Sequence, residues 1–375
     1  MHDPSSNSDW YRITNVDAVD SPALLLYIDR VKENIRLALE MVGNPERFRP
    51  HVKTHKSLEV TKLMIEKGVR KFKCATIAEA EMLGMAGAKD ILLAYQPVGP
   101  MAPRLIELIQ KYPDSRFSCL IDHIGVARQL GKLALSASLE ISVYLDLDVG
   151  MHRTGIEPGE KAIQLYRELG QVKGILPSGL HAYDGHIRNP DLAERTLVCD
   201  QVFAPVLQMR DTLVEMGMAS PVLIAGGSPT FLIHAGKTDR ECSPGTFVFW
   251  DLGYQTGLKE QPFRPAALVL ARVISMPSPD IICLGLGHKS VAAENVLSHR
   301  VQFLNAPNLE MIGQSEEHLV ARIKDGRSFE IGEVLYGIPF HVCPTVALYG
   351  SAVVIARNRV EGEWQIEARN RKIHI

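Results

Sequence analysis

A short basic stretch near the N-terminus carries residues that could do covalent chemistry. Residues 48–56 read Phe-Arg-Pro-His-Val-Lys-Thr-His-Lys. Apolar and polar residues alternate as far as Lys53, which predicts a strand with Lys53 at its last position. A lysine there, just ahead of a predicted helix, could form an imine with a carbonyl cofactor. The alternative is a surface lysine among basic neighbours.

Further reactive side chains follow other predicted strands. Residues 226–230 read Gly-Gly-Ser-Pro-Thr, and their small size would let backbone N–H groups approach an anion such as a phosphate. Arg153 lies in a loop after one predicted strand, and Tyr183 and His186 follow the next. Each of these is as often structural as functional. Their joint placement after strands predicts a shared site on one face of the fold.

His341 and Cys343 form a possible metal-binding pair. Residues two apart on an extended segment face the same way, so the imidazole and the thiolate could bind one ion. A single His-x-Cys pair also arises by chance, and the spacing alone does not decide between the two.

The elements that must position these residues alternate between strand and helix. We predict eight apolar strands, at residues 22–28, 48–53, 71–75, 90–94, 116–121, 140–146, 176–181 and 221–225, each followed by a helical or loop-and-helix segment. Eight such units predict a (β/α)8 barrel. An open, doubly wound sheet would show the same alternation.

The pattern changes after Phe247. Short segments rich in Val and Ile follow, separated by turns, at residues 267–275, 280–286, 301–304, 320–323, 346–356 and 364–368. They predict an all-β domain. We therefore expect a cofactor-binding barrel at residues 21–258 and a β domain at residues 259–375, which residues 1–20 would join.

The composition is that of a globular protein that acts on a small molecule. The 375 residues are 46% hydrophobic and 22% charged, with a net charge of −2. That balance argues against nucleic acid or an anionic membrane as the main partner. The N-terminus has no signal-peptide core and no segment is long enough to span a membrane, so a cytoplasmic location is expected. Six scattered cysteines suggest neither a disulfide framework nor a four-cysteine zinc site.

Taken together, the motifs resemble those of the fold-type III pyridoxal-phosphate enzymes, in the branch of D-threonine aldolase and D-serine dehydratase. The resemblance rests on residues 49–56, 225–230 and 244–246 and extends over nearly the whole chain. It implies an α/β fold, with an alanine racemase-like (β/α)8 barrel followed by a C-terminal all-β domain. It also implies pyridoxal 5'-phosphate as the cofactor, an amino acid as the substrate, and a homodimer.

The resemblance also implies roles for individual residues. Lys53 would carry the cofactor as a Schiff base and serve as the base at the substrate Cα, Arg153 would hydrogen-bond the phenolic oxygen, and Tyr183 would lie at the ring. The residues matching the phosphate site are Gly226, Gly227, Ser228, Gly245 and Thr246. His341 and Cys343 would bind a divalent metal, which is zinc in the dehydratases; manganese and magnesium are the alternatives.

Three functions compete at this point. The leading one is a metal-dependent lyase acting on a D-3-hydroxy amino acid, with β-elimination slightly favoured over aldol cleavage because His341-Val342-Cys343 resembles the dehydratase form. The aldolases have Gln-His where this chain has Arg188-Asn189. The base for the hydroxyl proton would then be missing, and His186 is a candidate replacement.

An amino-acid racemase is the second function. It would need a second base, for which Tyr336 or Tyr349 is a guess. The third is a non-catalytic carrier of pyridoxal phosphate. Carriers of this fold are single barrels, so the extra β domain argues against that reading.

Overall fold

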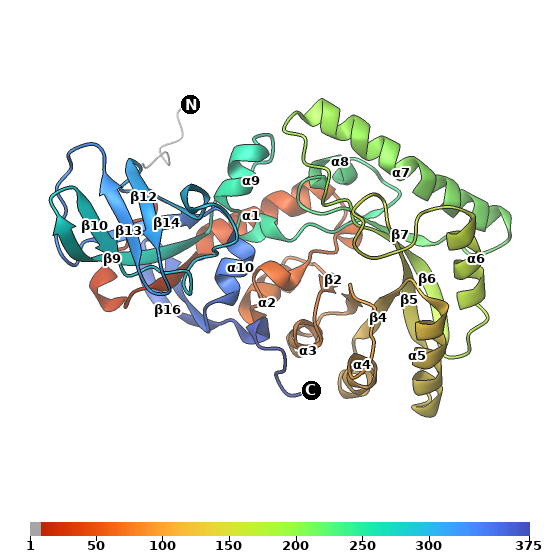
Figure 1. Ribbon diagram of the computed structural model, residues 1–375. Coiled ribbons are helices and arrows are strands. Elements are labelled where there is room, and N and C mark those ends of the chain that lie inside the picture. Colours follow the sequence, from red (N-terminus) through yellow and green to blue (C-terminus); the bar gives the residue numbers. More distant parts are fainter. Residues whose placement is uncertain (1–8) are drawn as a thin grey trace. The chain divides into compact units, whose positions relative to one another are not determined.

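The computed structural model describes residues 9–375 and divides into two compact units. The first, here called the sheet unit, comprises the described residues up to Ile35 together with Val248–Arg369. The second, the barrel unit, comprises Arg36–Phe247 and Asn370–Ile375. Figure 1 shows the elements of both units. No helix among the described residues is long and apolar enough to cross a membrane.

The barrel unit is built on parallel strands. Within residues 9–375 its sheet has seven strands, in the order of the chain: β2 (Lys71–Cys74), β3 (Asp90–Leu93), β4 (Arg116–Ile121), β5 (Ile141–Leu147), β6 (Ile175–Ala182), β7 (Val222–Ala225) and β8 (Glu241–Cys242). The extended residues 48–51 fill an eighth position, because Phe48 bridges Cys242 and His51 bridges Lys73, both in parallel. The predicted alanine racemase-like barrel is thereby confirmed.

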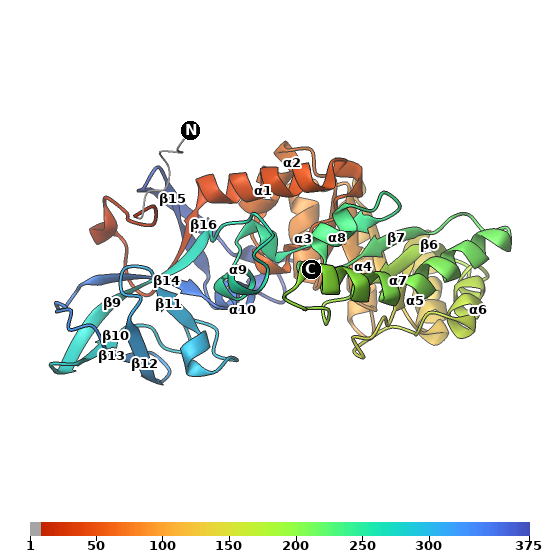
Figure 2. The ribbon, with the colours of Figure 1, turned by 90° about the horizontal axis from the view of Figure 1, so that it is seen from above.

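Helices follow the strands and cover the outside of the barrel unit (Figure 2). They are α2 (Leu58–Glu66), α3 (Ile77–Ala86), α4 (Met101–Lys111), α5 (Ile124–Ser136), α6 (Glu160–Leu169), α7 (Leu192–Glu215) and α8 (Phe231–Ala235). The start of α3 shows why these segments are helical: the Thr76 hydroxyl accepts the backbone N–H of Glu79 at 3.1 Å, as an N-cap does. Helix α1 (Ile28–Val42) belongs to both units.

Arg49 fills the interior of the barrel near the amino ends of the strands. Its guanidinium is fully buried and contacts the carboxylates of Asp90 at 2.5 Å and of Glu241 at 2.6 Å. These two residues begin β3 and β8. Such a buried, doubly paired arginine serves packing and stability rather than chemistry, because catalytic groups in barrels gather at the opposite, carboxyl ends.

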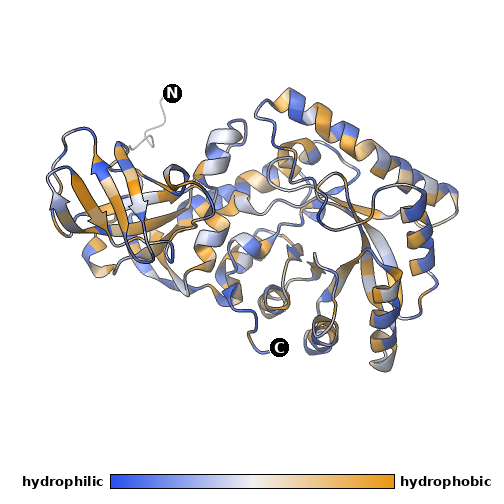
Figure 3. Cartoon of the chain, in the orientation of Figure 1, coloured by the Kyte–Doolittle hydropathy of each residue, from blue (hydrophilic) through white to orange (hydrophobic). Residues whose placement is uncertain are grey.

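The sheet unit is a nine-stranded sheet within the described part of the chain. Its strands are β1 (Ala23–Tyr27), β9 (Ala267–Ser278), β10 (Ile281–Leu284), β11 (Val301–Phe303), β12 (Leu309–Gln314), β13 (Leu319–Ile323), β14 (Val334–Pro339), β15 (Ser351–Ala356) and β16 (Arg359–Gln365). Short helices α9 (Leu252–Gly257) and α10 (Val342–Ala347) accompany them. Apolar residues run along the strands (Figure 3) and form two buried clusters, one of them around Val269 and Leu335. The predicted all-β character of this part is confirmed.

Short 3-10 helices link these elements. They are η1 (Val16–Ala18), η2 (Pro45–Arg47), η3 (Val52–Thr54), η4 (Thr246–Val248), η5 (Leu297–His299) and η6 (Glu367–Arg369).

One predicted strand of the barrel is wrong, and one strand of the barrel was not predicted. Residues 22–28 are not its first strand, because β1 pairs with β9 and β15 and so belongs to the sheet unit. The barrel strand that sequence reasoning missed is β8, which has only two residues and too short an apolar run to detect. The compact units accordingly divide at residues 35 and 247, whereas the sequence suggested 20 and 258.

Candidate active site

Lys53 stands immediately after an extended segment and not at its last position. The backbone is extended at His51, and Lys53 is the middle residue of η3 (Val52–Thr54). The Nδ1 atom of His51 accepts the backbone N–H of Lys53 at 3.2 Å and so caps this turn. The strand predicted to reach Lys53 therefore ends earlier, but its lysine still lies at the carboxyl end of a barrel strand.

A cavity of about 420 Å³ opens beside Lys53. That size suits a small molecule. Its walls come from segments at or after the carboxyl ends of the barrel strands and include Lys53, Arg153 and Tyr183. Three residues singled out from the sequence are thus brought together in one cavity.

The ring of Tyr183 lies among three cationic side chains. Its centroid is 4.9 Å from the Arg153 Cζ, 5.7 Å from the Lys53 Nζ and 5.8 Å from the Lys73 Nζ. Aromatic faces stabilise cations at such distances. The cavity therefore holds positive charge around an aromatic ring, an arrangement that favours an anionic, planar ligand.

Lys73, His181 and Asp146 form a buried network that sequence reasoning missed. His181 Nδ1 lies 2.7 Å from an Asp146 carboxylate oxygen, and His181 Nε2 lies 3.4 Å from the Lys73 Nζ. A carboxylate only accepts, so Nδ1 carries the imidazole proton and Nε2 accepts from Lys73. All three side chains line the cavity.

Burial sets the charge of this network. It lowers the pKa of Lys73 to about 7, helped by the nearby Lys53 cation. It also lowers the pKa of His181, again with a contribution from Lys73. Burial alone would raise the pKa of Asp146, but the hydrogen bond from His181 holds it below its usual value. The imidazole is thus neutral at pH 7, and Lys73 can release or take a proton there.

The loops after β7 and β8 meet at Ser228. Its hydroxyl oxygen accepts the backbone N–H groups of Gly245 at 3.4 Å and of Thr246 at 3.1 Å. Gly226 has φ of +75°, and a Cβ there would lie 2.4 Å from a carbon of His234. A Cβ on Gly227 would lie 2.9 Å from the Tyr183 ring. The five residues predicted to hold a phosphate are brought together, and both glycines are required by the backbone and the space.

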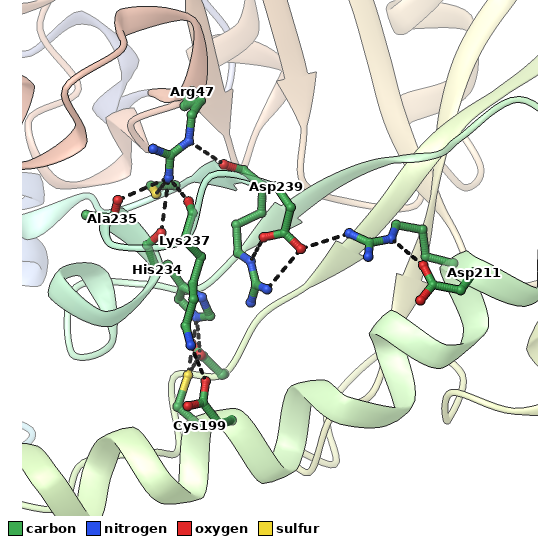
Figure 4. Close-up of polar contacts among 12 residues, drawn as sticks. Arg47, Cys199, Asp211, His234, Ala235, Lys237 and Asp239 are labelled. Atoms are coloured by element: carbon green, nitrogen blue, oxygen red, sulfur yellow. Dashed lines mark hydrogen bonds and ion pairs between the residues drawn. The ribbon is translucent and has the colours of Figure 1, made fainter. Parts of the chain in front are cut away.

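Asp184 supports this loop from behind. Its carboxylate accepts the Thr230 hydroxyl at 2.7 Å and His234 Nε2–H at 2.8 Å. Cys199 Sγ lies 3.6 Å from the same nitrogen (Figure 4). Asp184, Cys199 and His234 could hold a metal by type and distance. Burial raises the pKa of the Cys199 thiol, however, and both carboxylate oxygens already accept hydrogen bonds, so the cluster serves better to position the loop.

His186 does not reach the cavity. Its side chain is exposed and lies over Gly150, where a Cβ would come within 3.0 Å of its Nε2. It is absent from the side chains that line the cavity. Arg188 is also exposed, and its Nε donates to the backbone oxygen of Gly185 at 2.9 Å. The structure therefore offers no support for His186 as a base in that cavity.

In the sheet unit, His341 and Cys343 lie at the start of α10 and not on an extended segment. His341 is the N-cap, and Cys343 is the second residue of the helix. His341 Nδ1 lies 2.5 Å from the Glu294 Oε1. Burial alone would lower the pKa of His341, but Cys343 and Glu294 raise it to about 9. Glu294 was not recognised from the sequence, because 47 residues separate it from His341.

Comparison with known proteins identifies the family. Residues 26–252 match the model of the alanine racemase N-terminal domain, and residues 266–355 match a putative serine dehydratase domain. The chain belongs to the alanine racemase-like, fold-type III family of pyridoxal-phosphate enzymes. This confirms the family that the motifs suggested.

Several members of this family resemble the chain over nearly its whole length. D-threonine aldolase from Arthrobacter sp is 29% identical over 357 residues, covering 94% of this chain and 93% of that enzyme. D-threo-3-hydroxyaspartate dehydratase from Delftia sp. is 24% identical, covering 92% and 97%. The crystal structure of D-threonine aldolase from Filomicrobium marinum superposes with a TM-score of 0.86 at 25% identity, covering 94% and 95%.

The cavity of this fold-type III chain fits the cofactor of its family. Gly226 and Gly227, where a Cβ would collide with His234 and Tyr183, lie in a loop that Ser228 ties to the N–H groups of Gly245 and Thr246. The Lys53 amine and the Arg153 guanidinium meet at the Tyr183 ring. Pyridoxal phosphate has an aldehyde, a phenolic oxygen, an aromatic ring and a phosphate. An amine, a guanidinium, an aromatic side chain and a glycine-rich loop are suited to bind these four groups in turn.

The donors at α10 fit a divalent ion. An imidazole and a thiol lie two residues apart on one turn, both partly exposed, and they interact with each other while Glu294 contacts the imidazole Nδ1. One nitrogen and one sulfur donor suit zinc better than magnesium, which prefers oxygen.

Proposed function

We propose that this protein is a pyridoxal-phosphate- and divalent-metal-dependent lyase that acts on a D-3-hydroxy amino acid. The observation that carries the proposal is the cavity in which Lys53, Arg153 and Tyr183 meet. The relatives that cover nearly the whole chain support it, because they are named as aldolases and dehydratases of such substrates. β-Elimination remains slightly favoured over aldol cleavage, on the His-x-Cys sequence. The proposal includes a cytoplasmic homodimer, on family resemblance.

Pyridoxal phosphate, when bound, withdraws electrons from a bond at the Cα of an amino acid. Lys53 would hold it covalently and, once displaced by substrate, take or return the proton at Cα. Arg153 would hydrogen-bond the phenolic oxygen, and Tyr183 would pack on the ring. The phosphate would be held by Gly226, Gly227, Ser228, Gly245 and Thr246, the residues that converge at the two loops.

His341 and Cys343 would hold the metal, and zinc is the ion we propose. A divalent ion there supplies a Lewis acid for the β-hydroxyl of the substrate. The Cys343 side chain is a ligand only as the thiolate, so metal binding releases a proton and strengthens as pH rises.

The two tyrosines considered as the second base of a racemase are both engaged in hydrogen bonds. The hydroxyl of Tyr336 accepts the backbone N–H of Ile13 at 3.3 Å, and its side chain is buried. The hydroxyl of Tyr349 donates to the backbone oxygen of Ser290 at 2.7 Å. Burial raises the pKa of both phenols, so neither is suited to accept a Cα proton near pH 7.

Product analysis tests the function. Metal-loaded and EDTA-treated protein is incubated with D-serine, D-threonine and D-threo-3-hydroxyaspartate. Keto acid and ammonia would indicate dehydration, whereas glycine and an aldehyde would indicate aldol cleavage. Either product, lost on chelation and restored by zinc, supports the proposal. Racemisation of D-alanine without any lyase product would refute it.

Cofactor attachment is tested separately by borohydride reduction and peptide mapping. The reduced cofactor should be found on the peptide at Lys53 and should be absent from Lys53→Ala. Lys56→Arg is the matched control, because Lys56 is ion-paired with the buried Glu79 and arginine preserves that charge. Label that depends on Lys56 and survives Lys53→Ala would show the assignment to be wrong.

A further inference from the structure

Glu294 approaches the nitrogen of His341 that a metal would leave free. The distance between Glu294 Oε1 and His341 Nδ1 is 2.5 Å. An ionised carboxylate can only accept, so Nδ1 keeps its proton when the imidazole binds a metal. The lone pair must then lie on Nε2, the nitrogen that remains for a ligand.

The backbone around His341 is fixed independently of this contact. The Thr345 hydroxyl donates to the His341 carbonyl at 2.8 Å, and the Val342 N–H donates to the Asp251 carboxylate at 3.1 Å. Asp251 is buried and also accepts the N–H of Tyr254 at 2.9 Å. Since the backbone is held at one end and Nδ1 at the other, the imidazole ring has a defined direction.

The contact between Glu294 and His341 is poorly suited to stabilising the fold. Both side chains are 46% exposed, and ion pairs with that exposure contribute little to stability. A carboxylate that fixes the tautomer and direction of a metal-binding histidine is, by contrast, a common arrangement and strengthens the donor nitrogen.

We infer that Glu294 is a positioning residue for the metal: it holds His341 so that Nε2, together with the Cys343 thiolate, binds a divalent ion. The inference rests on the proposed function, since it requires that His341 and Cys343 bind that ion. It adds a residue outside the His-x-Cys motif, contributed by the loop before η5.

Zinc affinity, measured by competition with a chromophoric chelator on cofactor-loaded protein, tests the inference. Glu294→Gln should weaken zinc binding by about 10- to 100-fold, the usual effect of removing such a carboxylate. The zinc affinity of Glu294→Asp, which keeps the charge on a shorter side chain, should lie between those of the wild type and Glu294→Gln. The thermal midpoint without zinc should stay unchanged in both variants, because the pair is exposed.

Glu310→Gln is the matched control. Glu310 lies in the same unit, on β12, is also 46% exposed, and is ion-paired with Lys324 at 3.2 Å. Its replacement should leave zinc affinity unchanged. The double variant His341→Ala with Glu294→Gln should bind zinc no more weakly than His341→Ala alone, because Glu294 acts through the imidazole.

The outcomes separate this inference from the proposed function. Zinc affinity of Glu294→Gln within twofold of the wild type, with a large loss in His341→Ala, would overturn the inference and leave the metal site standing. A further loss on adding Glu294→Gln to His341→Ala would make Glu294 a direct ligand and also overturn it. A wild-type protein that binds no zinc would overturn both.

Discussion

Replacing Lys73 by methionine should change how the stability of the protein depends on pH. The side chain is 2% exposed, and burial, with the neighbouring Lys53, lowers its pKa from 10.5 to about 7. In the unfolded chain it regains its ordinary value. Between pH 7 and 10 the unfolded state therefore binds a proton that the folded state does not, and the free energy of unfolding of the wild type rises with pH across this window.

The size of the effect follows from the two pKa values of Lys73. A pKa difference of one corresponds to about 1.4 kcal/mol, so the wild-type free energy of unfolding should rise by about 3 kcal/mol between pH 7 and pH 10 through this residue. Lys73→Met keeps most of the apolar stem and removes the amine, so its rise should be smaller by that amount. Loss of the hydrogen bond to His181 costs about 1 kcal/mol at all pH values.

Urea unfolding of the cofactor-free protein at pH 7, 8, 9 and 10 measures this difference. Lys62→Met, at an exposed position on α2, is the control. Its free energy of unfolding should change with pH in parallel with that of the wild type. Curves for the wild type and Lys73→Met that also run parallel from pH 7 to 10 would refute the reasoning. Lys73 would then be fully charged in the folded state, and its environment would be far more polar than its burial indicates.

Three other substitutions test the cofactor site and its frame. Gly227→Asp should lower cofactor affinity by about 30-fold or more in a spectroscopic titration, because its Cβ would lie 2.9 Å from an aromatic ring and its charge would repel a phosphate. Asp184→Asn should lower that affinity about tenfold with little change in the Lys53 attachment site, since it loosens Thr230 and His234 behind the loop. Arg49→Met should lower the free energy of unfolding by about 3 kcal/mol in urea, because two buried carboxylates lose their shared cation.

The sequence was sufficient to place Lys53, Arg153 and Tyr183 in one site because each follows a barrel strand. Parallel strands end on the same face, so position along the chain alone brings such residues together. The same reasoning does not extend to His186, which does not line that cavity. That residue lies further along its loop, and the path of a loop is not set by the strand before it.

The assignment of β1 could not be made from its own residues. Ala-Leu-Leu-Leu-Tyr is apolar on both faces, as a central strand of either sheet would be. Its place is decided by pairing with β9 and β15, which follow it by more than two hundred residues.

For α10, Pro344 was the overlooked signal, since proline is tolerated in the first turn of a helix.

The two lysines of β2 show what alternation could have revealed. Lys71 and Lys73 flank Phe72, as the first and third residues of a four-residue strand, so both point to the barrel interior. Lys71 contacts Glu241 at 2.7 Å, on the side where Arg49 also meets carboxylates. A period of two among charged residues in a buried strand would have predicted interior lysines.

The different surroundings of these two lysines also explain why the chemistry lies at one end of the barrel. At the amino ends every interior cation named above has a carboxylate partner, so the charges are neutralised. At the carboxyl ends Lys73 contacts a neutral imidazole and has Lys53 nearby, and the carboxylates of Asp146 and Asp184 act on it less strongly than burial and Lys53 do. Unneutralised positive charge in a cavity of that size stabilises a bound anion, and a cofactor with a phosphate and a phenolic oxygen supplies one.

Binding of pyridoxal phosphate should therefore raise the pKa of Lys73 and flatten the rise of stability between pH 7 and 10. Urea unfolding of the cofactor-bound protein at the same pH values would measure this change. A free energy of unfolding that rises as steeply with pH as in the cofactor-free protein would place the anionic groups of the cofactor away from Lys73.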